Sequence, residues 1–270
     1  MWIRVCNTIQ GGISLLLASC LSFAQEQAQN AQQLADKLSN PVANMISVPF
    51  QNNVDYGIGQ YNGSKYTLNF QPVVPISIGP KLNLITRYII PIVDQRDITS
   101  EGSSQSGLSD ATISAFFAPK DIKNGFIWGV GPAFLVPVGT DDMLSTRKWG
   151  VGPTVLALKQ ANGITYGVLI NQLWSFAGDK NRSDINQMFL QPFFARNFPS
   201  GAGIGANAEI TFNWKAGITT GFLNPIITGI TKLGKLPISL GVGPRIPFGA
   251  TEESRADFGI RAVLTLIIPK

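Results

Sequence analysis

The feature that most constrains this chain is a series of short segments in which apolar side chains recur at every second residue. This period of two is typical of a β-strand whose faces meet different surroundings. Each segment also reaches the roughly 9–11 residues that a tilted strand needs to cross a membrane. We count about twelve segments: 45–56, 66–78, 82–93, 108–118, 126–137, 147–159, 164–175, 185–197, 203–214, 219–231, 236–248 and 256–268.

The connections between these segments differ in length in a regular way. Tight ones are 79–81, 160–163, 199–202 and 232–235, with a somewhat longer 119–125. Long polar ones are 57–65, 94–107, 139–146, 176–184 and 249–255, with 215–218 as a short exception. Outer-membrane barrels alternate short periplasmic turns with longer external loops. The pattern therefore predicts a transmembrane, antiparallel, up-and-down β-barrel of about twelve strands.

The two faces of the segments support this fold class. In 126–136 the apolar positions Phe126, Trp128, Val130 and Phe134 oppose Gly129, Gly131 and Ala133. We expect an apolar outer face and a polar or small inner face throughout. Six aromatic residues on the apolar face predict two interfacial girdles, with Trp128 and Tyr166 at the periplasmic side and Trp149, Trp174, Trp214 and Tyr66 at the external side.

Several prolines fall inside the predicted strands, where each removes a hydrogen bond from the ladder. They are Pro72, Pro75, Pro91, Pro132, Pro153, Pro192 and Pro244. Three of them follow Gly-Val-Gly, and the sequence Trp-Gly-Val-Gly-Pro occurs twice, at 128–132 and 149–153. We expect β-bulges at these points, which would bend the strands around a small barrel.

Composition narrows the function classes. Hydrophobic residues make up 44% of the 270 residues and charged residues 14%, against about 25% charged in ordinary soluble domains. No apolar run reaches the roughly 18 residues of a transmembrane helix. The net charge is +5, but the basic residues are scattered rather than gathered in a stripe. Nucleic acid is therefore not an expected partner.

The N-terminus has the character of a leader. Arg4 is its sole charged residue up to Ala24, an apolar stretch begins at Ile13, and Ser22-Phe23-Ala24 resembles a cleavage site. We expect residues 1–24 to be a signal peptide, 25–40 a periplasmic helix, tail or plug, and 41–270 the barrel. In the alternative, Leu17-Ala18-Ser19-Cys20 is a lipobox and Cys20 carries a lipid anchor.

The residue types present disfavour enzymatic chemistry. The sequence contains no histidine, so a Ser-His-Asp hydrolase has no imidazole base. Both cysteines, Cys6 and Cys20, fall in the expected leader, which leaves the mature chain without a thiol. Without these ligands a metal site would need a carboxylate cluster, and none is apparent. We expect no catalytic residues, no metal and no cofactor.

Charged residues on the inward face are the candidate site. Strand parity assigns Arg87, Asp110, Glu209, Arg245, Asp257 and Arg261 to the lumen. Ionised groups are tolerated there in water or in pairs. They predict either a channel lining that selects solutes by charge and size or an internal ion-pair network that holds a narrow barrel shut. The sequence leaves both readings open.

Five stretches carry a resemblance to a known family: 34–43, 87–92, 107–110, 128–142 and 241–245. They resemble bacterial outer-membrane transporters labelled as the meta-pathway of phenol degradation, sometimes misnamed neuromedin U. The resemblance covers nearly the whole mature chain and implies an outer-membrane barrel that takes up hydrophobic or aromatic compounds. One departure is the ending Leu266-Ile-Ile-Pro-Lys270, which lacks the terminal aromatic typical of barrel assembly signals.

Together these observations predict a non-enzymatic channel or transporter of the cell outer membrane for passive uptake of small, hydrophobic or aromatic solutes. Its expected partners are the lipid bilayer, a small-molecule solute and the outer-membrane assembly machinery. The alternatives are a closed structural barrel without transport activity and a periplasmic lipid-binding β protein anchored through Cys20.

Overall fold

One sheet, closed on itself, forms the body of the protein. The computed structural model describes residues 30–251 and 254–268. Their strands are β1 Ile46–Ile58, β2 Gly63–Phe70, β3 Val73–Ser77, β4 Leu82–Arg96, β5 Ser104–Leu108, β6 Ala111–Pro119, β7 Phe126–Val136, β8 Lys148–Ala161, β9 Ile164–Gly178, β10 Asn186–Asn197, β11 Ala202–Asn213, β12 Ile218–Leu233, β13 Leu236–Gly249 and β14 Phe258–Ile268.

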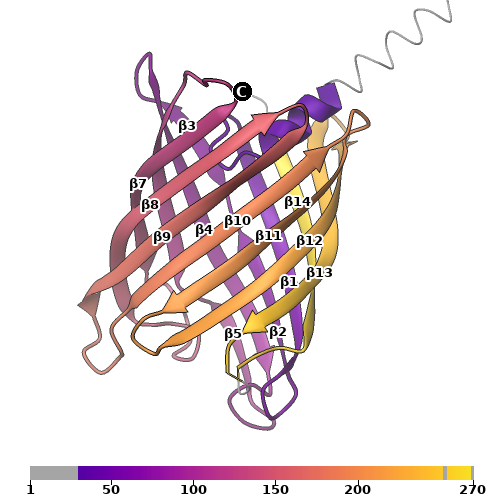
Figure 1. Ribbon diagram of the computed structural model, residues 1–270. Coiled ribbons are helices and arrows are strands. Elements are labelled where there is room, and N and C mark those ends of the chain that lie inside the picture. Colours follow the sequence, from indigo (N-terminus) through magenta and orange to yellow (C-terminus); the bar gives the residue numbers. More distant parts are fainter. Residues whose placement is uncertain (1–29, 252–253, 269–270) are drawn as a thin grey trace, which may run out of the picture.

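These strands make a twelve-stranded barrel. Strands β2 and β3 both pair with β4, as do β5 and β6, so each pair is one interrupted barrel strand. Every pairing is antiparallel, and β1 pairs with β14 from Ile46↔Ile268 to Tyr56↔Phe258, which closes the wall (Figure 1). The predicted fold class is confirmed. Among the described residues, no helix is long and apolar enough to cross a membrane.

Prolines explain both interruptions. The break between β2 and β3 contains Pro72, and the Gln71 amide bypasses it by donating to the Pro49 carbonyl at 2.9 Å. The break between β5 and β6 lies beside Pro91 of β4, whose carbonyl accepts from the Ser109 amide at 2.9 Å. The first break leaves Gln71 outside the regular ladder, and the second leaves Ser109 and Asp110 there. Gln71 and Asp110 are both described below, the first at an internal cavity and the second at the external rim.

The expected bulges do not lie at the Gly-Pro dipeptides themselves; the β8–β9 pairing shifts register at Trp149/Gly150, three residues before Pro153. The pairing β6–β7 is interrupted at Gly131-Pro132, but the register is the same before and after the gap. The β7 and β8 motifs instead face each other, with Pro132 opposite Pro153. A Cβ on Gly131 would lie 1.8 Å from the Ala115 carbonyl oxygen of β6. These glycines therefore permit a close backbone approach rather than an extra residue.

The outer face is apolar, as expected. All six predicted girdle aromatics are exposed, and they lie near the two ends of the wall. Trp214, just beyond β11, has 53% of its surface exposed, and its indole Nε1 donates to Gln172 Oε1 at 3.2 Å. Many other large apolar side chains between the girdles are exposed as well. Such a surface is suited to lipid, with the ring N–H and O–H groups at the polar boundaries.

The inner face differs from the expectation on one side of the barrel. We call the following set the apolar wall: Val73, Ile85, Phe116, Ala118, Ile127, Leu156, Leu158 and Leu169, from β3, β4 and β6 to β9. Ile85, Phe116 and Leu156 have no exposed surface. A uniformly polar or small inner face was therefore wrong for these strands. They pack on one another and on Val42, which precedes β1, so this side of the interior is a close-packed apolar surface.

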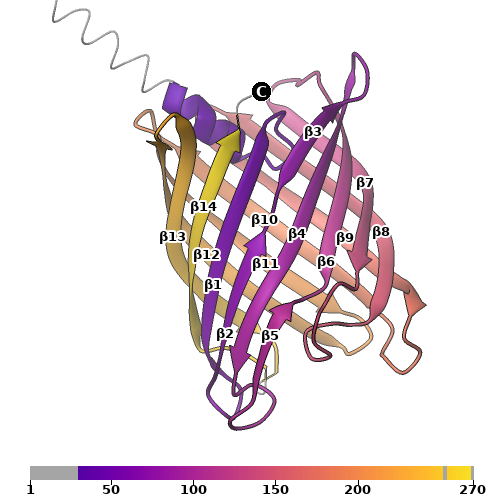
Figure 2. The ribbon, with the colours of Figure 1, turned by 180° about the vertical axis from the view of Figure 1, so that it is seen from behind.

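The opposite side of the interior is polar. We call the following set the polar wall: Asn53, Asp55, Glu209, Asn224, Arg245 and Arg261, from β1 and β11 to β14. Apart from the partly buried Glu209, all of these residues are buried. The lumen is thus two-sided, with hydrocarbon side chains on β3–β9 and amides and charges on β11–β1. Figure 2 shows how these strands follow one another around the barrel.

The connections also refine the expectations. Residues 57–65, expected as a long loop, are mostly strand, because β1 and β2 extend until residues 59–62 connect them. Residues 137–147 form a long external connection. A helix of residues 30–38 lies across the opposite mouth, at the end that carries the tight turns (Figure 1). Short turns mark that mouth as periplasmic. The expected leader 1–24 and Cys20 lie outside the described residues.

Candidate functional site

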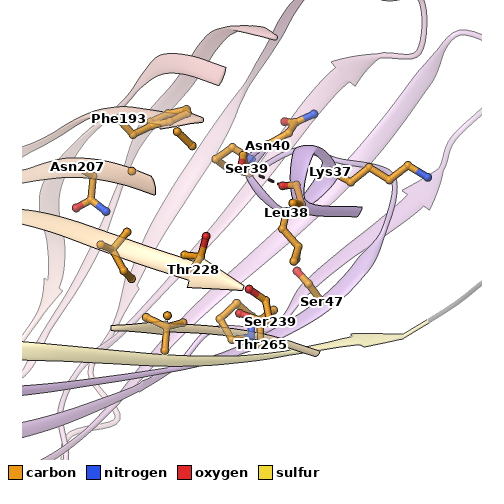
Figure 3. Close-up of a pocket in the computed structure, with 18 of the residues that line it drawn as sticks. Lys37, Leu38, Ser39, Asn40, Ser47, Phe193, Asn207, Thr228, Ser239 and Thr265 are labelled. Carbon is orange, nitrogen blue, oxygen red and sulfur yellow. Dashed lines mark hydrogen bonds between the residues drawn. The ribbon is translucent and has the colours of Figure 1, made fainter. Parts of the chain in front are cut away.

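A cavity of about 310 Å³ lies inside the barrel, next to the N-terminal segment. We use this name for residues 30–45, which comprise the helix and the chain that leads to β1. Figure 3 shows Leu38, Ser39 and Asn40 on one side of the cavity, and Phe193, Asn207, Thr228, Ser239 and Thr265 of the barrel on the other. The cavity is therefore a space between the N-terminal segment and the inner surface of β10–β14, and residues of β1, β3 and β4 complete its lining.

Hydrogen bonds fasten the N-terminal segment to two periplasmic turns. Asn197, the last residue of β10, donates through Nδ2 to Asp36 Oδ1 at 2.8 Å and to Ser39 Oγ at 3.0 Å. Its carbonyl accepts from Gln32 Nε2 at 3.3 Å. Gln160 of β8 donates to the Asp36 carbonyl at 2.6 Å. Asn197 is buried, with 6% of its surface exposed. Since it makes three of these four hydrogen bonds, it is the central anchor of the segment.

Apolar contact continues the attachment into the lumen. Val42 is buried and belongs to the same packed cluster as the apolar wall. Asn40 holds the local turn, because its Oδ1 accepts from the Val42 amide at 3.0 Å. Ala35 on the helix is also buried. The described part of the expected 25–40 segment thus forms a helix at the periplasmic mouth, and Val42 just after it reaches the packed interior.

A charge network crosses the polar wall. Glu209 of β11 accepts from Arg245 Nη1 of β13 at 2.9 Å and from both Nη atoms of Arg261 of β14, at 2.9 and 2.8 Å. Asp55 of β1 accepts from Arg245 Nε at 2.9 Å, and Asn53 accepts from Arg261 Nε at 2.7 Å. These contacts join β11, β13, β14 and β1, which follow one another in the sheet apart from the intervening β12, so the network runs along one side of the lumen.

Two neutral groups complete the network around Arg245. Its Nη1 also donates to Asn224 Oδ1 at 3.2 Å. Its guanidinium carbon lies 3.4 Å from the centroid of the Phe222 ring, a cation–π geometry. The guanidinium of Arg245 therefore has both charged partners, Asp55 and Glu209, and neutral ones, Asn224 and Phe222. Such a network holds its side chains rigidly.

Arg87 of β4 stands apart from the network. It lines the cavity and donates through Nη2 to Gln71 Oε1 at 2.9 Å. In the described part of the chain no carboxylate lies within ion-pair distance of it, whereas Arg245 and Arg261 both have one. Arg87 is thus an inward cation with a neutral partner.

Asp110 has a different task at the external rim. This buried carboxylate accepts from the Gly139 amide at 3.2 Å, from Ser145 Oγ at 2.7 Å and from the Thr146 amide at 2.7 Å. Thr146 Oγ1 is a further donor. Asp110 therefore folds the long 137–147 loop back onto the β5–β6 break. In the described residues, no arginine lies within ion-pair distance of Asp110.

A second tie joins external loops. Lys148, at the start of β8, donates to Asp184 Oδ1 at 2.9 Å. The hydrogen bond and charge of Lys148 hold the pKa of the exposed Asp184 carboxyl below its usual value of 3.8. Arg182 donates to the carbonyl groups of Asp142 and Ser145. The loops at 137–147 and 179–185 are thus connected to each other.

The six predicted residues consequently separate into groups. Glu209, Arg245 and Arg261 meet in one network, Arg87 lines the cavity, and Asp110 holds a loop. Asp257 is exposed and lies one position before β14 begins. The alternation of inward and outward side chains, which holds within a strand, therefore does not assign its direction. Asp55, Asn53 and Gln71 were not selected from the sequence. Parity would have found Asp55 and Asn53, because both alternate with outward residues of the segment 45–56. Within the described residues, no group of three or more potential ligands could hold a metal ion.

Comparison with solved structures decides the fold type. The chain is similar to the crystal structure of an outer-membrane channel from Pseudomonas putida F1, with a TM-score of 0.61 and 13% identity over 83% of this chain and 94% of that one. The fold is that of an outer-membrane β-barrel. Together with the exposed apolar belt, this places the barrel in the outer membrane. The outer membrane phospholipase A of Escherichia coli is a weaker match, with a TM-score of 0.44 and 9% identity over 82% of this chain and 96% of that one; it carries no functional argument.

Sequence comparisons add no further assignment to this barrel. No model of a known protein family matches the chain, and no curated protein matches it in sequence. Membership of the phenol-degradation transporters therefore remains a prediction. The coarser description of the chain as an outer-membrane barrel is supported by the structural match.

Proposed function

We propose that this barrel is a passive outer-membrane channel for small solutes and that its N-terminal segment restricts the periplasmic mouth. The observation that supports this most is the cavity of about 310 Å³ inside a closed, lipid-facing barrel. A wall that served only as a structural scaffold would have no need for an internal space beside a separately attached segment. The similar Pseudomonas putida barrel is described as a channel, which favours the same role here.

The two-sided lumen supports solutes that combine apolar and polar parts. The apolar wall offers a surface for hydrocarbon, and the polar wall offers hydrogen bonds and fixed charge. Uptake of hydrophobic or aromatic compounds, as the resemblance implies, fits the first of these surfaces. We further propose that the outer-membrane assembly machinery inserts the barrel, as it would any barrel of this kind.

Planar-bilayer recording and liposome uptake test the proposal with purified full-length protein. We expect discrete single-channel steps and entry of small solutes. The variant Asn197→Ala weakens the attachment of the N-terminal segment, because its hydrogen bonds to Asp36 and Ser39 are lost. We expect this variant to increase the fraction of time that the channel is open. Absence of both conductance and uptake, in the original protein and in this variant, would exclude a channel.

A closed structural barrel is the second candidate, and the network around Glu209 favours it. Arg245 and Arg261 both bind this carboxylate inside the lumen. If closure is their purpose, Glu209→Gln should lower stability and leave permeability unchanged. A change in conductance or ion selectivity in Glu209→Gln would instead place the network on the permeation path.

A further inference from the structure

We infer that the cavity is a binding site for a small organic monocarboxylate, whose charged end meets Arg87 and whose apolar body lies against Phe193 and Val73. This inference rests on the proposed function and names the solute class for it. All three residues, together with Gln71, line the cavity.

The charge at Arg87 is what selects an anion. Among the described residues of the lumen, the carboxylates of Asp55 and Glu209 form ion pairs with Arg245 or Arg261, and neither forms one with Arg87. Arg87 has one neutral acceptor, the Gln71 side-chain oxygen at 2.9 Å. A guanidinium has five N–H donors, so further donors remain for a ligand. An inward cation of this kind is costly without an anion or water, and a carboxylate matches its planar, forked geometry.

The other surfaces of the cavity define the body of the ligand. Val73 is buried and belongs to the apolar wall, and Phe193 packs against that wall. Amide side chains, including Gln51, Gln191 and Asn207, also line the space. A volume of about 310 Å³ lies at the lower end of small-molecule pockets, which span roughly 300–1,000 Å³. The cavity is therefore suited to a molecule the size of one ring or a short chain.

The position of the cavity gives such a site a role in passage. It lies between the barrel wall and the N-terminal segment, whose residues Leu38 and Ser39 form part of its boundary (Figure 3). A carboxylate that arrives from the external mouth would stop at Arg87 until this segment moves. The site thus concentrates the solute directly before the periplasmic closure.

Ligand-observed NMR titration of the purified full chain in detergent tests the inference, with benzoate as the probe and benzamide as its neutral counterpart of the same shape. We expect benzoate to bind at least tenfold more tightly than benzamide, since hydrogen bonds to charged groups are the stronger ones. Inorganic phosphate is a third probe. It should compete weakly because it has no apolar body, and equal competition would overturn the organic part of the inference.

Two variants remove the charge in different ways. Arg87→Gln deletes it, while Gln71→Glu keeps the arginine and supplies a carboxylate where the 2.9 Å contact now lies. Both should reduce benzoate affinity to the benzamide level. The matched control is Arg96→Gln on the same strand, where the side chain is 69% exposed beside Asp94; its benzoate affinity should stay within twofold of the original. Heat-modifiable migration in gels reports folding, and Gln71→Glu provides the test if Arg87→Gln does not fold.

The outcomes separate this inference from the proposed function. Equal affinity for benzoate and benzamide, or unchanged benzoate binding in the folded charge variants, would overturn the site. Binding with the expected dependence on Arg87 but without conductance would keep the site and refute the channel. Conductance without selective binding would do the reverse.

Discussion

Asn197 at the end of β10 donates to Asp36 of the N-terminal helix over 2.8 Å, so one amide side chain joins the barrel to the segment in its mouth. The same nitrogen serves Ser39 at 3.0 Å. Asn197→Ala should destabilise the docked segment by about 1–3 kcal/mol, because two side-chain hydrogen bonds are lost and one of them involves a carboxylate. Limited proteolysis should then cleave within residues 30–45 faster than in the original protein.

The control for this change is Asn213→Ala. Asn213 Oδ1 accepts from the Lys215 and Ala216 amides at the external rim, far from the segment. The Asn213→Ala variant removes the same type of side chain as Asn197→Ala and should leave the cleavage of residues 30–45 unchanged. Equal proteolysis of Asn197→Ala and the original protein would show that the anchor lies elsewhere.

Glu209→Gln should destabilise the barrel by about 3–5 kcal/mol, since it leaves two buried arginines without their shared carboxylate. Urea titration followed by heat-modifiable gel migration measures this loss. Glu101→Gln, in an exposed external connection, is the matched control and should have no effect. Stability equal to the original protein would mean that water or ions replace Glu209 inside the lumen.

Asp110→Asn should release the 137–147 loop without unfolding the wall. The Thr146 amide and hydroxyl both donate to Asp110 Oδ2, and an amide nitrogen at either position would oppose one set of donors. Trypsin should therefore cut after Arg147 faster in the variant, while the midpoint of urea unfolding stays the same. Asp121→Asn, an exposed change in a periplasmic turn, is the comparison; a loop equally protected in both would count against the role of Asp110.

Acid should loosen the external loops through Asp184. The pKa of the Asp184 carboxyl in the folded protein lies below the usual 3.8 because Lys148 donates to it. The ion pair therefore contributes its full stabilisation of the loops when the pH is above that usual value. The contribution disappears as the pH falls through the lower, folded pKa. Hydrogen exchange of residues 179–185 should accordingly show extra protection at pH 6 that is lost toward pH 2. Asp184→Asn should remove that difference; a variant with the original pH profile would contradict this assignment.

The sequence predicted the wall well because period-two alternation is a local property of each strand. Interruptions at Pro72 and Pro91 did not obscure it, since both halves of each broken strand pair with β4. The two-sided character of the lumen was harder to predict from the sequence. Alternation reports a difference between faces, and this difference disappears where Ile127 and Leu135 point inward between outward apolar neighbours.

The candidate site was predictable only where a charge sits within a regular strand. Parity brought Glu209, Arg245 and Arg261 together, although their shared contacts depend on barrel curvature that no single strand encodes. Asp257 illustrates the opposite case, because parity loses its meaning one residue outside β14. The loop contacts of Asp110 and the contact of Arg87 with Gln71 arise at strand breaks, where side-chain direction no longer follows from sequence position.

The N-terminal helix is the first described element to be synthesised, yet its docking partners come much later in the chain. The Gln160 contact spans 124 positions and the Asn197–Asp36 contact 161. The helix can therefore seat only after most of the wall exists, so closure of the periplasmic mouth is a finishing step of biogenesis. Until that moment the cavity beside the helix would lack the part of its boundary that residues 35–45 supply.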